Sequence, residues 1–127
     1  GTITFYINGT IAGTASWATT QDTGPLEIGR QSPSSCLCNL YNGSIDELRL
    51  WNVTRSASDI FNNRNSIIPT TTPGLGAYYR FDQGVANGNN AGLTTVFDFS
   101  PNGNHGTLVS SGNPLVLNGN TSNWVSG

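Results

Sequence analysis

The sequence predicts an all-β protein, an antiparallel β-sandwich of the jelly-roll type with one short helix near residues 56–64. Composition is the first reason: Gly, Asn, Thr and Ser fill most of what is not hydrophobic, and charged residues make up only 9%. The second is a series of short segments in which apolar and polar residues alternate. The third is the Asn-Gly dipeptide, which favours two-residue hairpin turns. It begins at Asn8, Asn42, Asn87, Asn102 and Asn118.

The first half of the chain supplies the clearest strands. Thr2–Ile7 alternates, turns at Asn8-Gly9 and returns through Thr10–Ser16, which predicts a β-hairpin. Leu26–Gly29 predicts a short strand. Ser44–Trp51 has spacing closer to period two than to a helix, so it predicts the central strand.

A helix and three further strands are expected next. Ser56, followed by Asp59 three residues later, is typical of a helix N-cap, so we expect a helix over Ser56–Arg64. The Pro- and Thr-rich connector Ile67–Gly74 interrupts any regular element. The remaining strands are expected at Leu75–Phe81, Thr94–Phe99 and Thr107–Val109, with a tight turn over Ser100–Gly106.

The charge balance excludes two classes of partner. The chain has no lysine, and its five arginines face seven acidic residues, which gives a net charge of −2. Binding to nucleic acid or to an anionic membrane surface depends on clustered Lys and Arg, so we expect neither. No apolar run approaches the roughly 18 residues that a membrane-spanning helix needs.

Two cysteines, Cys36 and Cys38, lie two positions apart. They are compatible with a redox-neutral structural pair, with a local or intermolecular disulfide, or with a metal. Metal is the least favoured reading, because a zinc site takes four ligands and the single histidine, His105, lies far away in a predicted turn.

Several motifs occur in a recognisable order. They are ITFYINGTIAG, PLEIGR and YNGSIDELRLWNVTRSASDI, followed by LGAYYRFDQG and DFSPNGNHGTL. The series resembles the laminin G-like (LamG) jelly-roll domain of the concanavalin A-like lectin/glucanase superfamily, well over residues 2–64 and moderately over 75–108. This resemblance implies a concanavalin A-like sandwich from a bacterial secreted or surface protein. It says less about function, because the superfamily includes lectins, enzyme modules and spacers.

The order of the motifs departs from that family. Its members usually have a preceding half, and LGAYYRFDQG resembles their opening strands although it follows the helix here. We therefore expect residues 1–127 to form a single LamG-like domain that lacks its N-terminal half and is closed by the strand from Leu75. Alternatively, residues 1–64 end one domain and residues 75–127 begin another. Either arrangement leaves a sheet edge at which another chain or another copy can pair.

Catalysis is not expected. Superfamily enzymes that cleave β-glucans resemble one another in a Glu-x-Asp-x-x-Glu strand, which places two carboxylates on one face. Here Asp46 and Glu47 are adjacent, so a strand would send them to opposite faces. A Ser-His-Asp arrangement is equally unsupported, since the only histidine is His105.

Calcium is the metal that the sequence favours. Residues 98–103, DFSPNG, have the oxygen spacing of the first half of a Ca²⁺ loop, although Val109 occupies the position of the bidentate glutamate. Further oxygens would therefore come from elsewhere. The alternative is a plain Asx-turn in which the aspartate binds its own backbone. The candidate ligands are Asp98, Ser100, Asn102, Asp82 and Asp46.

Aromatic residues in loops are the candidates for sugar binding, because a pyranose has an apolar face and a polar rim. Trp17 is the first candidate, with Gln21 close by in the same predicted loop. Tyr41, which precedes a turn, is the second. Trp51 is expected in the core, because it ends the central strand.

Together these patterns predict a non-catalytic extracellular or cell-surface module of a larger protein. It would bind a glycan or an extracellular protein ligand, or serve adhesion. One alternative is a structural spacer or assembly unit that pairs through its open sheet edge. The other is an accessory module of a carbohydrate-active enzyme.

Overall fold

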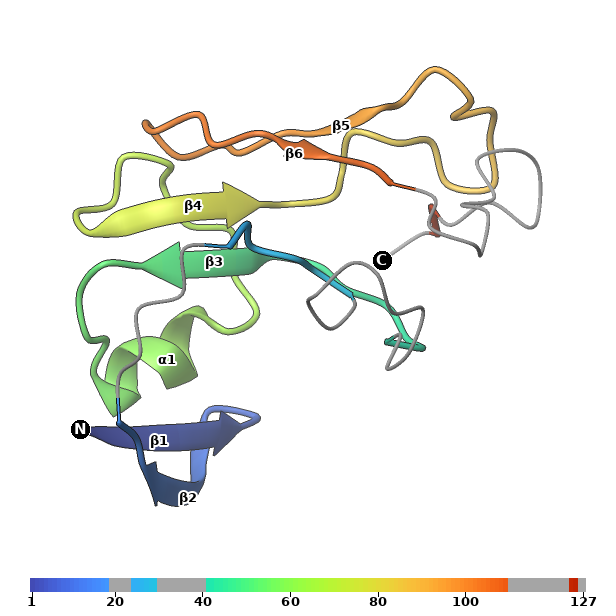
Figure 1. Ribbon diagram of the computed structural model, residues 1–127. Coiled ribbons are helices and arrows are strands. Elements are labelled where there is room, and N and C mark those ends of the chain that lie inside the picture. Colours follow the sequence, from blue (N-terminus) through green and yellow to red (C-terminus); the bar gives the residue numbers. More distant parts are fainter. Residues whose placement is uncertain (19–23, 30–40, 110–123, 126–127) are drawn as a thin grey trace.

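The computed structural model describes residues 1–18, 24–29, 41–109 and 124–125 (Figure 1). These residues form three two-stranded antiparallel sheets and one short helix, which confirms the predicted fold class, although each sheet is small. The elements are β1 Thr2–Ile7, β2 Thr10–Ser16, β3 Leu48–Trp51, α1 Ala57–Asn63, β4 Leu75–Tyr79, β5 Thr95–Val96 and β6 Gly106–Thr107.

The hairpin β1–β2 has the predicted bounds and turn. Asn8 and Gly9 have φ values of 53° and 79°, as a type I′ turn requires. Ile7 pairs with Thr10 beside this turn, and the register shifts once between Phe5 and Tyr6. The Asn-Gly pair therefore sets the register of the whole hairpin.

The core lies on both sides of β4. One cluster joins Leu75 and Tyr78 to Ile68, with Trp51 packed against it, which confirms the core position predicted for Trp51. The second cluster joins Ala77 and Tyr79 of β4 to Val96. Tyr78 and Tyr79 are consecutive and point to opposite faces, so β4 contributes to both clusters. Leu75 lies beyond the register shift of the β3–β4 pair and joins the cluster of Tyr78.

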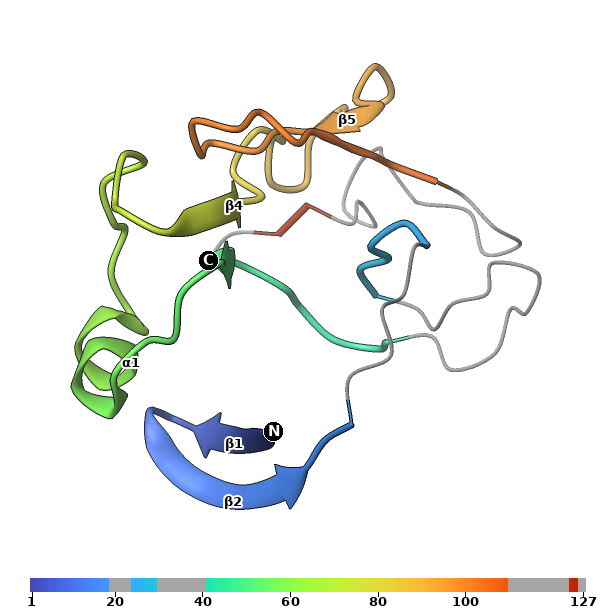
Figure 2. The ribbon, with the colours of Figure 1, turned by 60° about the vertical axis from the view of Figure 1, so that its left-hand side comes forward.

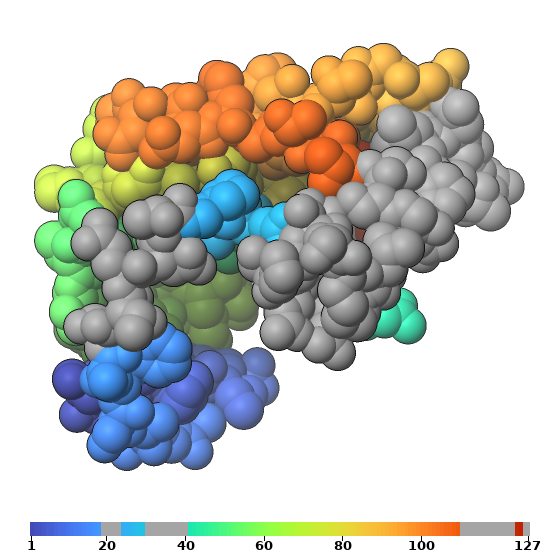
Figure 3. All heavy atoms as spheres, viewed as in Figure 1, coloured from blue at the N-terminus to red at the C-terminus, as the bar shows by residue number. Residues whose placement is uncertain are grey.

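The elements are stacked in order (Figures 1 and 2). The β3–β4 pair lies between the β5–β6 pair on one side and α1 on the other, and the hairpin lies beyond α1. In the space-filling view the hairpin forms a lobe at the lower left, next to the helical segment (Figure 3). Helix α1 is the element that contacts it, through β2.

The helix confirms its predicted start. Ser56 is the N-cap, with extended backbone, and its hydroxyl oxygen accepts a hydrogen bond of 3.1 Å from the Asp59 N–H. Arg55 immediately precedes the N-cap and forms an ion pair of 3.4 Å with Asp59. The acidic residue in the first turn also complements the positive end of the helix dipole.

Several strand predictions are too long. The central strand begins at Leu48 rather than Ser44, because Glu47 has a φ of 52°, outside the extended region. The next strand ends at Tyr79 rather than Phe81, whose φ is 54°. The strand predicted at Thr94–Phe99 is shortened to β5, and the last strand is shortened and begins one residue earlier, at Gly106.

The predicted strand at Leu26–Gly29 is wrong. These residues form no regular element, and Gly29 has a φ of 83°. Leu26 and Ile28, which would share one face of a strand, are both exposed, so the expected apolar face is not buried. Cys36, Cys38 and Gln21 lie outside the described residues, and the domain organisation stays a prediction.

Candidate ligand-binding site

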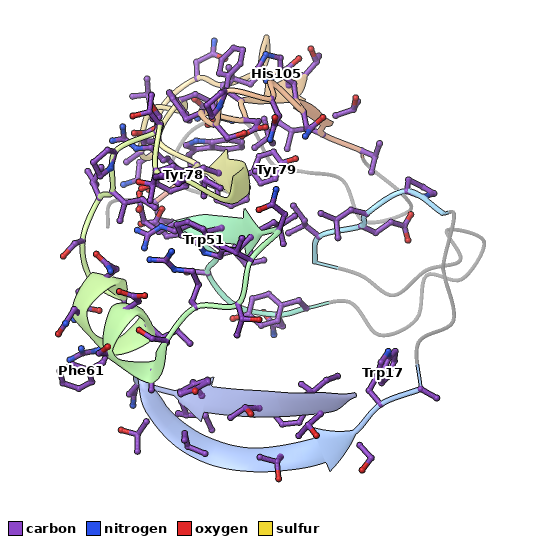
Figure 4. All side chains as sticks on the ribbon, turned by 90° about the vertical axis from the view of Figure 1, so that its left-hand side faces the viewer. Trp17, Trp51, Phe61, Tyr78, Tyr79 and His105 are labelled. Carbon is purple, nitrogen blue, oxygen red and sulfur yellow. The ribbon has the colours of Figure 1, made fainter. Side chains whose placement is uncertain are left out.

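Trp17 is an exposed aromatic side chain on a fixed backbone. Its N–H donates to the Gly1 carbonyl at 2.9 Å, and the Gly1 nitrogen donates to the Trp17 carbonyl at 2.8 Å. These bonds extend the hairpin ladder by one pair beyond β1 and β2. The side chain is 54% exposed and stands at the end of the hairpin away from Phe61 (Figure 4). Because the backbone is fixed, only the side-chain rotamer has to be ordered when the ring stacks on a ligand.

Tyr41 is a second exposed ring next to a turn. It is 58% exposed, and its N–H donates to the Gly29 carbonyl at 2.8 Å. Its hydroxyl donates to the Ser44 carbonyl at 3.3 Å, and a Cβ on Gly43 would lie 2.6 Å from the phenol oxygen. The ring therefore lies against the glycine of the turn, which leaves its other side open. In the described part of the chain, no hydrogen bond or ring contact joins Tyr41 to Trp17.

The predicted metal-binding turn is organised around Asp98, which is buried. Its Oδ1 accepts hydrogen bonds of 2.8 Å from the N–H groups of Tyr78 and Ser100. Its Oδ2 accepts 2.9 Å from the Ser100 hydroxyl and 2.8 Å from the Asn104 N–H. This is the geometry of an Asx-turn that also reaches across to β4, so the carboxylate connects the turn to the core strand.

These hydrogen bonds control the ionisation of Asp98. Burial alone would raise its pKa, because it disfavours the charged form. The hydrogen bonds from Ser100, Tyr78 and Asn104 outweigh burial, so the pKa of Asp98 is lowered below its usual value. The carboxylate is therefore held ionised inside the protein.

The other proposed calcium ligands have separate partners. Asn102 donates its side-chain amide to the Gly76 carbonyl at 2.8 Å. Asp82 pairs with Arg80 at 2.7 Å, and Asp46 accepts the Glu47 N–H at 2.8 Å. Among the described residues, no group of three His, Cys, Asp or Glu side chains is placed to hold a metal. The calcium site stays a prediction that rests on Asp98 and Ser100.

Glu47 lies at the centre of a polar cluster beside β4. Its carboxylate pairs with Arg49 and Arg80 and accepts a hydrogen bond from the Tyr78 hydroxyl. Burial raises the pKa of Tyr78, and the neighbouring Glu47 carboxylate raises it further. Asp46 and Glu47, which the sequence places side by side, therefore have different partners and form no pair of facing carboxylates.

His105 has a structural role. Its Nδ1 accepts a hydrogen bond of 3.1 Å from the Asp98 N–H, and its ring meets that of Phe97 edge to face. It lies over the β5–β6 pair, away from the hairpin (Figure 4). The interpretation of His105 as a turn residue fits this position.

Sequence reasoning missed a cavity between the hairpin turn and the helical segment. Its volume is about 570 Å³. The lining residues are Tyr6, Asn8, Gly9, Ile60, Arg64 and Asn65. They come from two segments that are far apart in the sequence, so no local motif marks the site. Two features of the sequence could have indicated the walls of the cavity. They are the Asn-Gly turn, which forms one wall, and the polar residues that follow the helix.

The described structure thus defines an antiparallel β protein with exposed aromatic side chains and an open polar cavity, a combination that suits ligand binding. No helix in the described residues is long and apolar enough to cross a membrane.

A family model described as the concanavalin A-like lectin/glucanases superfamily, of the laminin G type, matches residues 1–61. The match confirms the resemblance that the motifs of residues 1–61 predicted, and this superfamily points to a carbohydrate- or ligand-binding module. Comparison with curated proteins and with solved structures gave no match.

Proposed function

We propose that this chain is a non-catalytic module of a larger extracellular or cell-surface protein and that it binds a glycan. The observation that carries the proposal is Trp17: its ring is 54% exposed while hydrogen bonds on both backbone polar groups hold its position. An indole in this setting offers a flat apolar surface to the apolar face of a sugar ring. The superfamily match over residues 1–61, which includes Trp17, supports the same conclusion.

The engagement of the acidic residues supports a non-catalytic role. A glycosidase needs two carboxyl groups on either side of one bond, roughly 5–10 Å apart and open to the substrate. Asp98 is buried with both oxygens hydrogen-bonded, and Glu47 is paired with two arginines. Asp59 and Asp82 each pair with a neighbouring arginine. These described carboxylates have structural partners rather than an open position facing one another.

A glycan array probed with the 127-residue chain tests the proposal, followed by titration of any sugar that binds. Trp17→Ala should weaken binding at least about tenfold, since stacking on an aromatic ring and the area it buries together exceed about 1.4 kcal/mol. The matched control is Phe97→Ala, which truncates another exposed ring, 44% exposed, next to His105. Failure of every sugar to bind would refute glycan binding, whereas equal affinity of the Trp17 variant and the parent would refute the role of Trp17.

Assembly through a sheet edge is the second candidate function. Among the described residues, β3 pairs with β4 on one side and with no strand on the other. An edge of this kind can accept a strand from another copy or another chain. Light scattering decides between the two: a concentration-dependent dimer supports assembly, and a monomer at all concentrations opposes pairing between copies. The glycan-binding function would also suit an accessory module of a carbohydrate-active enzyme.

A further inference from the structure

The cavity beside the hairpin turn is built by a close approach of two segments. Gly9, at the turn, lies so near α1 that a Cβ on it would meet the Phe61 Cα at 2.9 Å. The same Cβ would lie 3.3 Å from the Arg64 Cδ. The turn and the end of the helix are therefore in contact, and the cavity of about 570 Å³ opens beside that contact. This volume is in the range of roughly 300–1,000 Å³ that small-molecule sites occupy.

Arg64 gives this cavity a positive charge that no described carboxylate neutralises. The other described arginines are all paired: Arg49 with Glu47, Arg55 with Asp59, and Arg80 with both Glu47 and Asp82. Arg64 instead lies over the Phe61 ring, 4.0 Å from its centroid, and donates from Nη1 to the Phe61 carbonyl. These two contacts fix the guanidinium and leave most of its five N–H donors available.

The rest of the lining suits a sugar. The side-chain amides of Asn8 and Asn65 can both donate and accept hydrogen bonds, as sugar hydroxyls require. Tyr6 and Ile60 supply an aromatic ring and an aliphatic surface. A neutral sugar offers the guanidinium no opposite charge. A carboxylate does, and its two oxygens can accept hydrogen bonds from two coplanar N–H groups of the guanidinium.

We propose that this cavity binds the carboxylate-bearing residue of an acidic glycan, a uronate, through Arg64. The proposal rests on the glycan-binding function proposed above and deepens it by naming the class of sugar and a subsite separate from Trp17. Asn8 and Asn65 hold the ring hydroxyls, and Tyr6 and Ile60 contact the apolar face. The sequence alone could not indicate this site, because its two walls meet only in the fold.

Calorimetric titration with a short oligogalacturonide and with the corresponding neutral oligogalactoside tests the proposal. The acidic sugar should bind more tightly than the neutral one, and its affinity should fall as salt concentration rises. Arg64→Gln should lower the affinity for the acidic sugar about tenfold, because hydrogen bonds to a charged group exceed about 1.4 kcal/mol, and leave the neutral sugar unaffected. Arg55→Gln is the matched control, since Arg55 lies over Trp51 and outside the cavity. Thermal unfolding of each variant checks that it is folded.

The outcomes separate this proposal from the one on which it rests. If the acidic sugar binds and Trp17→Ala weakens it while Arg64→Gln does not, the glycan-binding function stands and the Arg64 subsite is refuted. Equal affinity for acidic and neutral sugars refutes the subsite in the same way. If no sugar binds, both proposals fail. Binding of an acidic peptide with loss in Arg64→Gln, and of no sugar, would assign the cavity to a protein ligand and overturn the choice of a glycan.

Discussion

Replacing Asp98 by asparagine is the most direct test of the structural argument. The substitution keeps the size of the side chain but removes the charge, and one oxygen becomes an NH₂ group. If Oδ1 keeps its bonds to the Tyr78 and Ser100 N–H groups, the new NH₂ faces the Asn104 N–H, which can only donate, and the Ser100 hydroxyl, which would have to reverse its bond. Two charge-assisted hydrogen bonds are then lost in a buried position.

The expected loss of stability follows from those two bonds. A hydrogen bond to a charged group contributes roughly 1.5–3 kcal/mol, so Asp98→Asn should lower the free energy of unfolding by about 3–5 kcal/mol. This is a large part of the stability of a small domain, so Ser100→Ala is the milder companion. It removes the 2.9 Å bond to Oδ2 and two longer bonds of 3.3 Å, to the Gly76 carbonyl and from the Asn102 N–H, and should cost about 2–3 kcal/mol.

Urea unfolding followed by tryptophan fluorescence measures both variants. Asp82→Asn is the matched control, because Asp82 pairs with Arg80 near the surface, and it should change the free energy of unfolding by at most about 1 kcal/mol. A loss below about 1 kcal/mol in Asp98→Asn, with an unchanged denaturant slope, would refute the claim that the carboxylate connects the turn to β4.

The pH dependence has a defined sign. The pKa of Asp98 is lower in the folded protein than in the unfolded chain, where it is about 3.9. Its contribution is therefore complete above about pH 4 and is lost as the pH falls through the folded pKa. The parent protein should lose stability on acidification below about pH 4 more steeply than Asp98→Asn does. Parallel curves for the two proteins would contradict this.

Three further predictions concern other parts of the molecule. Gly9→Ala should lower the stability by about 2 kcal/mol, because alanine is strained at a φ of 79° and its Cβ would meet the Phe61 backbone; thermal unfolding measures the change. Glu47→Gln should cost about 2–3 kcal/mol in chemical unfolding, less than a fully buried ion pair because the side chain is 24% exposed. A calcium site at Asp98 predicts a higher melting temperature in CaCl₂ than in EDTA. An unchanged melting temperature would refute the calcium site.

The local chemistry of short segments made part of the fold predictable. Asn8-Gly9 specifies its turn because both positions adopt positive φ at low cost, and the hairpin bounds follow. Ser56 specifies the start of α1 because its hydroxyl replaces a missing backbone partner. In both cases the deciding interaction lies within four residues, so the sequence contains all the information.

Strand ends and sites depended on distant contacts. The backbone of Glu47 leaves the extended region, and its side chain contacts Arg49, Arg80 and Tyr78. Tyr78 lies on the next strand, β4, and Arg80 directly follows it. The φ of Glu47 could not be foreseen from alternation. The Arg64 cavity was missed for the same reason, since one wall belongs to the hairpin turn and the other to the end of α1.

The contact between the hairpin and α1 has a kinetic consequence. The amide of Tyr78 is buried and bonded to Asp98, so it should exchange with deuterium only when the core opens. A two-stranded hairpin is marginally stable by itself, so its amides should exchange once this contact separates, which needs much less energy. A ligand bound between the turn and the helix would couple the hairpin to the rest of the protein. Hydrogen exchange in the hairpin should then slow when the cavity is occupied, while exchange in the core stays the same.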